Sequence, residues 1–374
     1  MPVQSRVVVF GGTGHFGARI CRRLAQEPDL DLVVTSRTHN RAQCFAEELC
    51  DHPAAVSGAA IDQNSTGLAD RLRELDPTVV IHTAGPYQGQ DYRVAKACID
   101  AGCHYVDLAD GRQFVAGFDV LDAEAKAAGV VLISGASTLP GISGSVVDEL
   151  RDRFRQIKRI ETSIAPAHQT PRGLGTVRAV LSYCGAPFDT WRDGEWRTVH
   201  GWQDLRWQRY PSLGRRLSGA CDVPDLALFP HYVPGVRTVS FHAGLEAPWE
   251  QLGLWAMAWL TRASLVRDWA KHAPRFAAMS ERLIRFGSIR GGMHMRIQGT
   301  GLDGKPQTCD WHLVAEQNHG PEIPCTPAIV VAKQLLEGKL SKPGAYPCLG
   351  LFAVAEFMKE LAGFDVSTRL VEEG

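Results

Sequence analysis

The first apolar residues of the chain form an unbroken run, Val7-Val8-Val9-Phe10, that leads directly into a glycine-rich stretch. After the glycines, apolar residues recur at helical spacing, at Ile20, Leu24 and Ala25. A short continuous apolar run is typical of a buried strand, and spacing of three to four residues is typical of an amphipathic helix. The pattern therefore predicts a strand, a glycine turn and a helix.

The same alternation continues to about residue 135. Further strand patterns lie at residues 30–36, 56–61, 78–83, 103–107 and 130–134, and helical patterns lie at 41–49, 91–101 and 118–128. Strands that alternate with helices are typical of a doubly wound parallel sheet covered on both faces. We therefore predict an α/β fold with an N-terminal Rossmann domain over residues 1–135.

The pattern changes after Ser134. Strand patterns at 159–165, 237–243, 293–299 and 308–316 are mixed with irregular segments, which predicts an α+β second domain over residues 136–322. Helical patterns at 326–338 and 351–361 predict a segment, residues 323–374, that packs back on the first domain. The apolar stretch 252–266 contains Arg262 and is too short to span a bilayer. We expect a buried helix there, with contact to a membrane surface as the alternative.

The glycine turn reads Gly12-Thr13-Gly14-His15-Phe16-Gly17, between the first strand and the first helix. In a dinucleotide-binding fingerprint the first glycine makes the tight turn, the second admits the pyrophosphate, and the third lets helix and strand pack closely. The free N–H groups at the helix N-terminus favour phosphate. We expect these six residues to bind a dinucleotide; a purely structural turn is the alternative.

The second strand ends at Ser36-Arg37, where NAD-specific sites carry an acidic residue for the ribose 2′-hydroxyl. A hydroxyl and a guanidinium suit a 2′-phosphate, so we expect NADP rather than NAD. In the alternative, Arg37 stacks on adenine or faces water. Asp62 follows the third strand and is a candidate acceptor for the adenine amino group, or a helix cap beside Ser65 and Thr66.

Two further strands end in candidate chemistry. Ala84, Gly85 and Pro86 follow the fourth strand and are small enough for the nicotinamide half of the cofactor. Tyr87 is expected to stack on nicotinamide or to donate a proton, or to form an apolar wall. Asp107 and Asp110 follow the fifth strand and are the candidate catalytic acids. Asp107 as a structural cap and Asp110 as part of a surface ion pair are the alternatives.

Substrate contacts are expected from four residues. These are His104, Ser143, His168 and Arg172. An arginine in the cleft would bind a substrate carboxylate. His104 as a packed strand residue, and surface roles for His168 and Arg172, are the alternatives. The tryptophans of the middle region are expected to lie mostly in the core.

Composition narrows the classes of protein. The 374 residues carry a net charge of −1, which argues against a nucleic-acid binder. The ten cysteines lack paired metal-ligand spacing, so we expect no metal and a reduced, cytoplasmic protein. The early first strand also leads us to expect no signal peptide.

The sequence resembles the saccharopine dehydrogenase-like oxidoreductases. The resemblance rests on residues 11–17, 84–87 and 102–108, on the turn Leu139-Pro140-Gly141-Ile142-Ser143, and on the segment 323–338. It implies an NAD(P)-linked oxidoreductase with a Rossmann domain and an inserted substrate domain. Many members transfer hydride to or from a C=N or C=O carbon of an amino-acid-like metabolite. A homodimer is a further expectation for this fold.

One position departs from the family. Saccharopine-forming members usually carry an acidic residue just before the proline–glycine turn, where this chain has Leu139. Saccharopine is therefore not the expected substrate. The alternatives are a reductase of an apolar or lipid-like compound, and a non-catalytic NADP-binding regulator.

Overall fold

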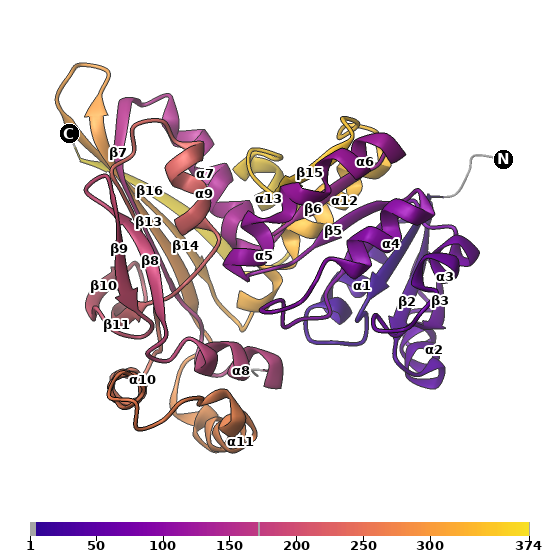
Figure 1. Ribbon diagram of the computed structural model, residues 1–374, viewed down its shortest axis with the longest axis horizontal. Helices are drawn as coiled ribbons and strands as arrows, with labels where there is room; N and C mark the ends of the chain where they lie inside the picture. The colour runs from indigo at the N-terminus through magenta and orange to yellow at the C-terminus, as the bar shows by residue number, and fades with distance from the viewer. Residues whose placement is uncertain (1–4, 171–172, 374) are drawn as a thin grey trace. The chain divides into compact units, whose positions relative to one another are not determined.

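The computed structural model describes residues 5–170 and 173–373 (Figure 1). Within these ranges the chain forms two compact units. The first contains residues 5–145 and 322–361, and the second contains residues 146–321 and 362–373. Each unit has its own sheet and its own buried core.

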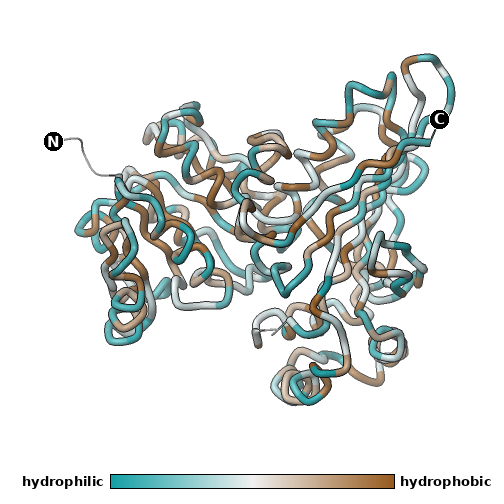
Figure 2. The backbone as a smooth tube through the Cα atoms, turned by 180° about the vertical axis from the view of Figure 1, so that it is seen from behind, coloured by the Kyte–Doolittle hydropathy of each residue, from teal (hydrophilic) through white to brown (hydrophobic). Residues whose placement is uncertain are grey.

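The first unit is built on a seven-stranded parallel sheet. Its spatial order is β15-β6-β5-β4-β1-β2-β3. The strands are β1 (Ser5–Phe10), β2 (Leu30–Ser36), β3 (Ala55–Ala60), β4 (Val79–His82), β5 (His104–Asp107), β6 (Val131–Ser134) and β15 (Gly344–Pro347). Every residue of β4 and β6 is buried, as expected for a parallel sheet with both faces covered. This confirms the predicted Rossmann sheet, and Figure 2 shows the hydrophobic colour gathered along these strands.

Helices connect and cover the strands of this sheet. They are α1 (Gly17–Leu24), α2 (His39–Glu47), α3 (Leu68–Leu75), α4 (Arg93–Ala101), α5 (Arg112–Ala116), α6 (Asp122–Ala128), α12 (Thr326–Leu336) and α13 (Val354–Glu360). In α1 the apolar positions Ile20 and Leu24 are buried, as their spacing predicts. Arg23 of α1 donates to Thr326 Oγ1 at 2.7 Å and to the carbonyl of Glu360 at 2.7 Å, so the returning helices are tied to the Rossmann sheet.

The second unit contains a nine-stranded mixed sheet, which confirms the expected second α+β domain. Seven strands follow the order β10-β11-β12-β7-β13-β14-β16, and β8 pairs with both β12 and β9. The strands are β7 (Phe154–Ala165), β8 (Pro187–Arg192), β9 (Glu195–His200), β10 (Arg206–Tyr210), β11 (Gly214–Ala220), β12 (Thr238–Gly244), β13 (Gly291–Gly301), β14 (Pro306–Ala315) and β16 (Val366–Glu373). Its helices are α8 (Leu174–Ser182), α9 (Asp225–Tyr232), α10 (Pro248–Arg262) and α11 (Ala273–Leu283). The helix α7 (Ser143–Arg151) leads from the first unit into the second.

The end of the chain differs from the expected arrangement. Residues 323–374 were expected to pack on the first domain, but β16 pairs antiparallel with β14 in the second sheet. Its exposed, partly charged sequence carries little apolar signal, because it lies at the edge of that sheet. The strand β15 likewise escaped prediction, since its sequence Gly-Ala-Tyr-Pro contains Gly and Pro, which are depleted in strands.

Two expectations about burial are wrong. The stretch 252–266 was expected to be a buried helix, but α10 exposes Leu252 by 47% and Trp259 by 46%. The tryptophans of the middle region were expected mostly in the core, yet Trp196 and Trp207 are 45% and 58% exposed. Hydrophobicity of a short segment does not reveal whether a neighbouring element covers it.

Candidate functional site

The glycine turn after β1 is shaped by close backbone packing. Gly11 has a φ of +70°, and its carbonyl accepts from the N–H of Gly14 at 2.8 Å. A Cβ on Gly12 would lie 2.8 Å from Val34 Cγ1, and a Cβ on Gly17 would lie 2.2 Å from the carbonyl oxygen of Gly11. Gly12 and Gly17 therefore cannot carry side chains without a shift of the backbone or of a buried strand residue.

Gly14 has a different environment. A Cβ there would meet only the carbonyl oxygen of Gly11, at 3.0 Å, so the space beyond it is open. The turn lies at the N-terminus of α1, where the positive end of the helix dipole favours an anion. This open cradle fits the pyrophosphate of a dinucleotide, with Thr13, Gly14 and His15 as the residues that would hold it.

The carboxyl ends of β1 and β4 meet at the point where the strand order of the sheet reverses. Thr83 Oγ1 donates to the carbonyl of Phe10 at 2.7 Å, and a Cβ on Gly11 would lie 3.3 Å from Ala84 Cβ. In open α/β sheets, ligands bind at this switch point, beyond the carboxyl ends of the strands. The fold thus brings the glycine turn and the segment Ala84-Gly85-Pro86 together, as the sequence predicts for cofactor-binding residues.

The residues around the turn have partners of their own. His15 and Phe16 pack edge to face, with ring centroids 5.0 Å apart, and the His15 carbonyl accepts from Arg19 at 2.6 Å. Burial, and secondarily the charge of Arg19, lower the pKa of His15. Cys325 of the returning segment donates its thiol to the Phe16 carbonyl at 3.6 Å.

Ser36 and Arg37 stand at the carboxyl end of β2. Ser36 is buried, and Arg37 is exposed. Arg41, one helical turn later, donates to the carbonyl of Thr13 at 3.3 Å, so Arg41 is adjacent to the glycine turn. Asp62 accepts from the N–H of Asn64 at 2.9 Å and caps its own turn, and α3 begins only at Leu68.

Tyr87 is buried and its hydroxyl donates to the carbonyl of His82 at 2.6 Å. The imidazole ring of His82 packs edge to face on the Tyr87 ring, with ring centroids 5.4 Å apart. Burial, then the nearby charge of Asp107, raises the pKa of Tyr87 well above its usual value. These contacts favour the wall role for Tyr87 over the role of proton donor.

His82 and its neighbours form a buried polar cluster that the sequence pattern did not single out. His82 Nδ1 lies 2.9 Å from the Tyr105 hydroxyl, and Nε2 lies 3.0 Å from Gln63 Oε1. Burial lowers the pKa of His82 to about 4, so the ring is neutral near neutral pH. The only available signal was a histidine at the end of an otherwise apolar strand.

Asp107 is fully buried at the carboxyl end of β5. Its Oδ1 accepts from the N–H groups of Gly135 (2.7 Å) and Ala109 (2.9 Å) and from Ser134 Oγ (3.1 Å). Burial raises the pKa of Asp107 to about 6, although these hydrogen bonds oppose the effect. The contacts favour a positioning role, in which Asp107 holds the turn after β6.

Asp110 and His104 lie near opposite ends of β5. Asp110 is exposed beyond the carboxyl end of β5 and accepts from Gln88 at 3.1 Å. His104 lies at the opposite, amino end, where its Nδ1 accepts from the N–H of Val131 at 3.0 Å. Parallel strands present all their carboxyl ends at one edge of the sheet, so His104 faces away from the cofactor edge. This geometry favours the packed strand role for His104.

The remaining substrate candidates are also engaged. Ser143 is fully buried and donates to the carbonyl of Pro140 at 3.3 Å. His168 lies in the second unit, where its ring Nε2 is 3.0 Å from the Leu283 carbonyl. Its backbone N–H donates to the Glu246 carboxylate at 3.2 Å. Arg172 lies outside the described residues.

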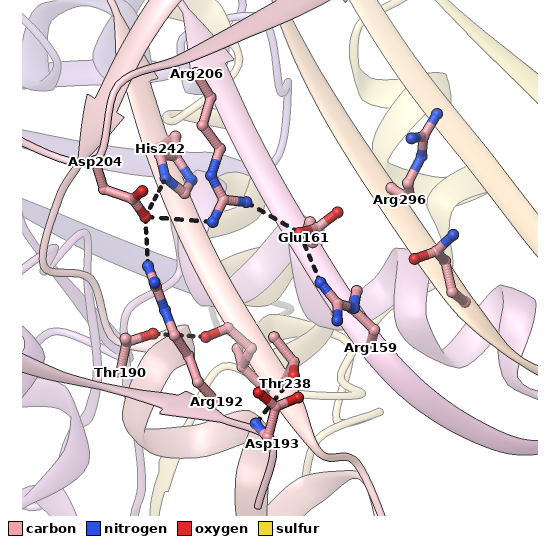
Figure 3. A network of polar contacts seen from close by, with 12 residues as sticks. Arg159, Glu161, Thr190, Arg192, Asp193, Asp204, Arg206, Thr238, His242 and Arg296 are labelled. Carbon is pink, nitrogen blue, oxygen red and sulfur yellow. Dashed lines mark hydrogen bonds and ion pairs between the residues drawn. The ribbon is translucent and has the colours of Figure 1, made fainter. Parts of the chain in front are cut away.

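The second sheet carries an ionic network that the sequence reasoning missed (Figure 3). Asp204 contacts His242 at 3.5 Å, Arg206 at 3.3 Å and also Arg192. Arg206 continues to Glu161 at 3.1 Å. The hydrogen bond with His242, followed by those with the arginines, holds the pKa of Asp204 well below its usual range.

A second cluster lies across β13 and β14. Arg296 donates to both oxygens of Asp310 at 2.8 Å, and His294 Nε2 lies 2.7 Å from the same carboxylate. His312 stacks on His294 with ring centroids 4.7 Å apart. Arg296 is the strand neighbour of Glu161, so both clusters belong to one band across the sheet. Strand pairing brings together residues that are distant in sequence, and no local motif marks them.

Residues 5–170 and 173–373 contain no cluster of His, Cys, Asp or Glu arranged to hold a metal ion. No helix in the described part of the chain is long and apolar enough to cross a membrane.

Comparisons with known proteins agree with this architecture. The family described as saccharopine dehydrogenase NADP binding domain matches residues 7–133, and no curated protein matches the chain. Among solved structures, saccharopine dehydrogenase (L-Glu forming) from Saccharomyces cerevisiae is 18% identical, with a TM-score of 0.70, over 98% of this chain and 100% of that chain. Amine dehydrogenase from Mycobacterium smegmatis is 11% identical, with a TM-score of 0.49, over 93% of this chain and 95% of that chain. Residues 7–133 therefore form a domain of the saccharopine dehydrogenase NADP-binding type, and the chain shares the fold of the yeast saccharopine dehydrogenase.

Proposed function

We propose that this protein catalyses an NADP-linked oxidation or reduction at a C=N or C=O carbon of an amino-acid-like metabolite other than saccharopine. The observation that carries the proposal is the switch point of the first sheet, where the glycine turn and Ala84-Gly85-Pro86 meet at one edge. When bound, the dinucleotide would supply or accept hydride.

The residues of the chain would bind the cofactor and hold the surrounding turns in place. Thr13, Gly14 and His15 would hold the pyrophosphate, and Ser36 and Arg37 the 2′-phosphate. Asp107 fixes the turn after β6 through three hydrogen bonds to one oxygen. Asp110, which is exposed at the same edge, is the better placed of the two acids to exchange a proton with a substrate.

The ionic band on the second sheet carries a surplus of positive charge. In its Asp204–Glu161 part, Arg159, Arg192 and Arg206 outnumber the two carboxylates. A surplus guanidinium is suited to a carboxylate ligand. The solved relative with the same fold is a saccharopine dehydrogenase that forms L-glutamate, which agrees with this substrate class. Leu139, at the position where an acid is usual in saccharopine-forming members, is buried.

A second candidate substrate is an apolar carbonyl compound. The exposed tryptophan-rich face of α10 favours it, because such a face can contact an apolar phase.

The test is NADPH consumption, followed by absorbance, with 2-oxo acids offered together with amino acids and, separately, with long-chain ketones. Turnover with the ionic mixtures supports the proposal, and turnover confined to the apolar ketones would replace it with the second candidate. Failure with every compound, in both directions, by a preparation that binds NADPH would contradict both. The variant Gly14→Ala serves as the control for cofactor-dependent turnover.

A further inference from the structure

The outward face of α10 is apolar over roughly half of the helix circumference, at 100° per residue. Its large exposed side chains are Trp249 (62%), Leu252 (47%), Trp255 (37%), Trp259 (46%) and Leu260 (39%). Eight of the thirteen large hydrophobic side chains exposed in the described residues lie between Trp249 and Phe286. Exposed apolar residues are common singly, but a contiguous group of this size marks an interaction surface.

The orientation of α10 is fixed by polar contacts on its inner side. Gln251 is fully buried and accepts from the N–H of Leu245 at 3.1 Å. Arg262, at the end of the helix, donates to Gln203 at 2.6 Å and lies over the Trp259 ring at 4.5 Å. The apolar face therefore points outward because the helix is anchored through its few polar residues.

The helix α11 is joined to α10 through Trp269. The indole N–H of Trp269 lies 3.2 Å from the Met257 carbonyl and 3.0 Å from Thr261 Oγ1, and its ring packs on Phe276 of α11 at 6.3 Å. Figure 1 shows the two helices together in the second unit. Met279 of α11 and Phe286, which follows it, are also exposed apolar side chains of this segment, at 50% and 62%.

The same segment is strongly basic. Residues 248–290 contain seven basic residues and three acidic ones, whereas the whole chain carries a net charge of −1. All seven basic side chains are exposed: Arg262, Arg267, Lys271, Arg275, Arg282, Arg285 and Arg290. We call this surface the tryptophan–arginine face, defined by residues 248–290.

We propose that the tryptophan–arginine face binds the surface of an anionic lipid membrane, with the α10 side chains at the boundary of headgroups and acyl chains. Tryptophan prefers that boundary, and a helix with a large apolar face and nearby Lys or Arg binds in its plane. The basic side chains are attracted to anionic headgroups. A second copy of the chain is a poorer partner, because a two-fold contact would place this basic segment against itself.

The experiment is flotation of the full chain with vesicles of phosphatidylcholine alone and with vesicles containing half phosphatidylglycerol. We expect binding to the anionic vesicles, loss of that binding at high salt, and a blue shift of tryptophan emission. The double variant Trp255→Ser with Trp259→Ser should weaken binding about tenfold or more. The double variant Arg275→Glu with Arg282→Glu should weaken it to a similar extent.

Matched controls use exposed residues outside this face. Trp207→Ser on β10 and Arg215→Glu on β11 should bind vesicles as the unaltered chain does. Unchanged urea unfolding of every variant shows that the second unit is folded, and the readout needs no turnover. Absence of binding to anionic vesicles, equal binding to neutral ones, or loss of a dimer in the tryptophan variant without any vesicle binding would each overturn the proposal.

Discussion

Gly17 packs directly against the carbonyl oxygen of Gly11, since a Cβ at position 17 would lie 2.2 Å from that oxygen. We predict that Gly17→Ala lowers the free energy of unfolding by several kcal/mol, because backbone atoms cannot move aside as a flexible side chain can. Urea unfolding of the variant and the unaltered chain measures the difference. A variant of equal stability would mean that helix α1 can shift without cost.

Gly14 is the matched position in the same turn. Its Cβ would meet only the Gly11 carbonyl, at 3.0 Å, so Gly14→Ala should lose much less stability than Gly17→Ala. The added methyl group occupies the open side of the turn, and NADPH affinity should fall at least about tenfold. Fluorescence titration with NADPH measures it. Full affinity in Gly14→Ala would place the pyrophosphate elsewhere.

Arg37 should decide between the two dinucleotides. Arg37→Glu places a negative charge at the end of β2, which disfavours a 2′-phosphate and suits a free 2′-hydroxyl. We expect NADPH affinity to fall by about tenfold or more and NADH affinity to hold or rise. Arg71→Glu on α3, where the side chain is 42% exposed, is the control. Equal losses for both dinucleotides would remove Arg37 from the phosphate site.

His82 should make stability depend on pH. Its pKa is about 4 in the folded chain, against about 6.5 when unfolded, so the stabilisation is present above pH 6.5 and is lost as pH falls toward 4. The loss amounts to about 3 kcal/mol. Comparison of His82→Gln with the unaltered chain at pH 7 and pH 4.5 isolates it, and the exposed His39→Gln serves as control. A constant difference between the two chains would contradict the assignment.

Asp107 should make the stability of the chain depend on pH in the opposite direction from His82. Its folded pKa of about 6 exceeds the unfolded value of about 4, so its contribution is present below pH 4 and is lost as pH rises through 6. The Asn variant should therefore gain stability relative to the unaltered chain by up to about 3 kcal/mol between pH 4 and pH 7. If Asp107→Asn also abolishes turnover while the variant stays folded and binds NADPH normally, Asp107 is catalytic and not only positioning.

Much of the first unit was predictable because its elements are locally encoded. Val7 to Phe10 are apolar without interruption since both faces of the sheet are covered, and the strand 30–36 was predicted with the bounds that the structure has. The glycine turn could also be predicted from the sequence. The steric limits on Gly12 and Gly17 come from neighbours in the same β-α unit and from adjacent strands.

The candidate site was less predictable where the role of a side chain depends on which hydrogen-bond partners the fold brings to it. His104 and Asp107 belong to one four-residue strand, yet His104 lies at its amino end and Asp107 at its carboxyl end, where the cofactor is expected. The sequence left stacking, proton donation and an apolar wall open for Tyr87, and the hydrogen bond from its hydroxyl to the His82 carbonyl favours the wall. The Asp204–Arg206–Glu161 network comes from three strands, so only strand pairing could bring those residues together.

By itself the sequence determined the dinucleotide turn, the α/β alternation and the likeness to the saccharopine dehydrogenase-like oxidoreductases. These properties depend on residue type and on spacing along one segment. The tertiary structure alone decided that α10 turns its tryptophans outward, that β16 joins the second sheet, and that Asp107 is enclosed by three donors. Burial and partnership are properties of what packs against a residue, and that information is distributed over distant parts of the chain.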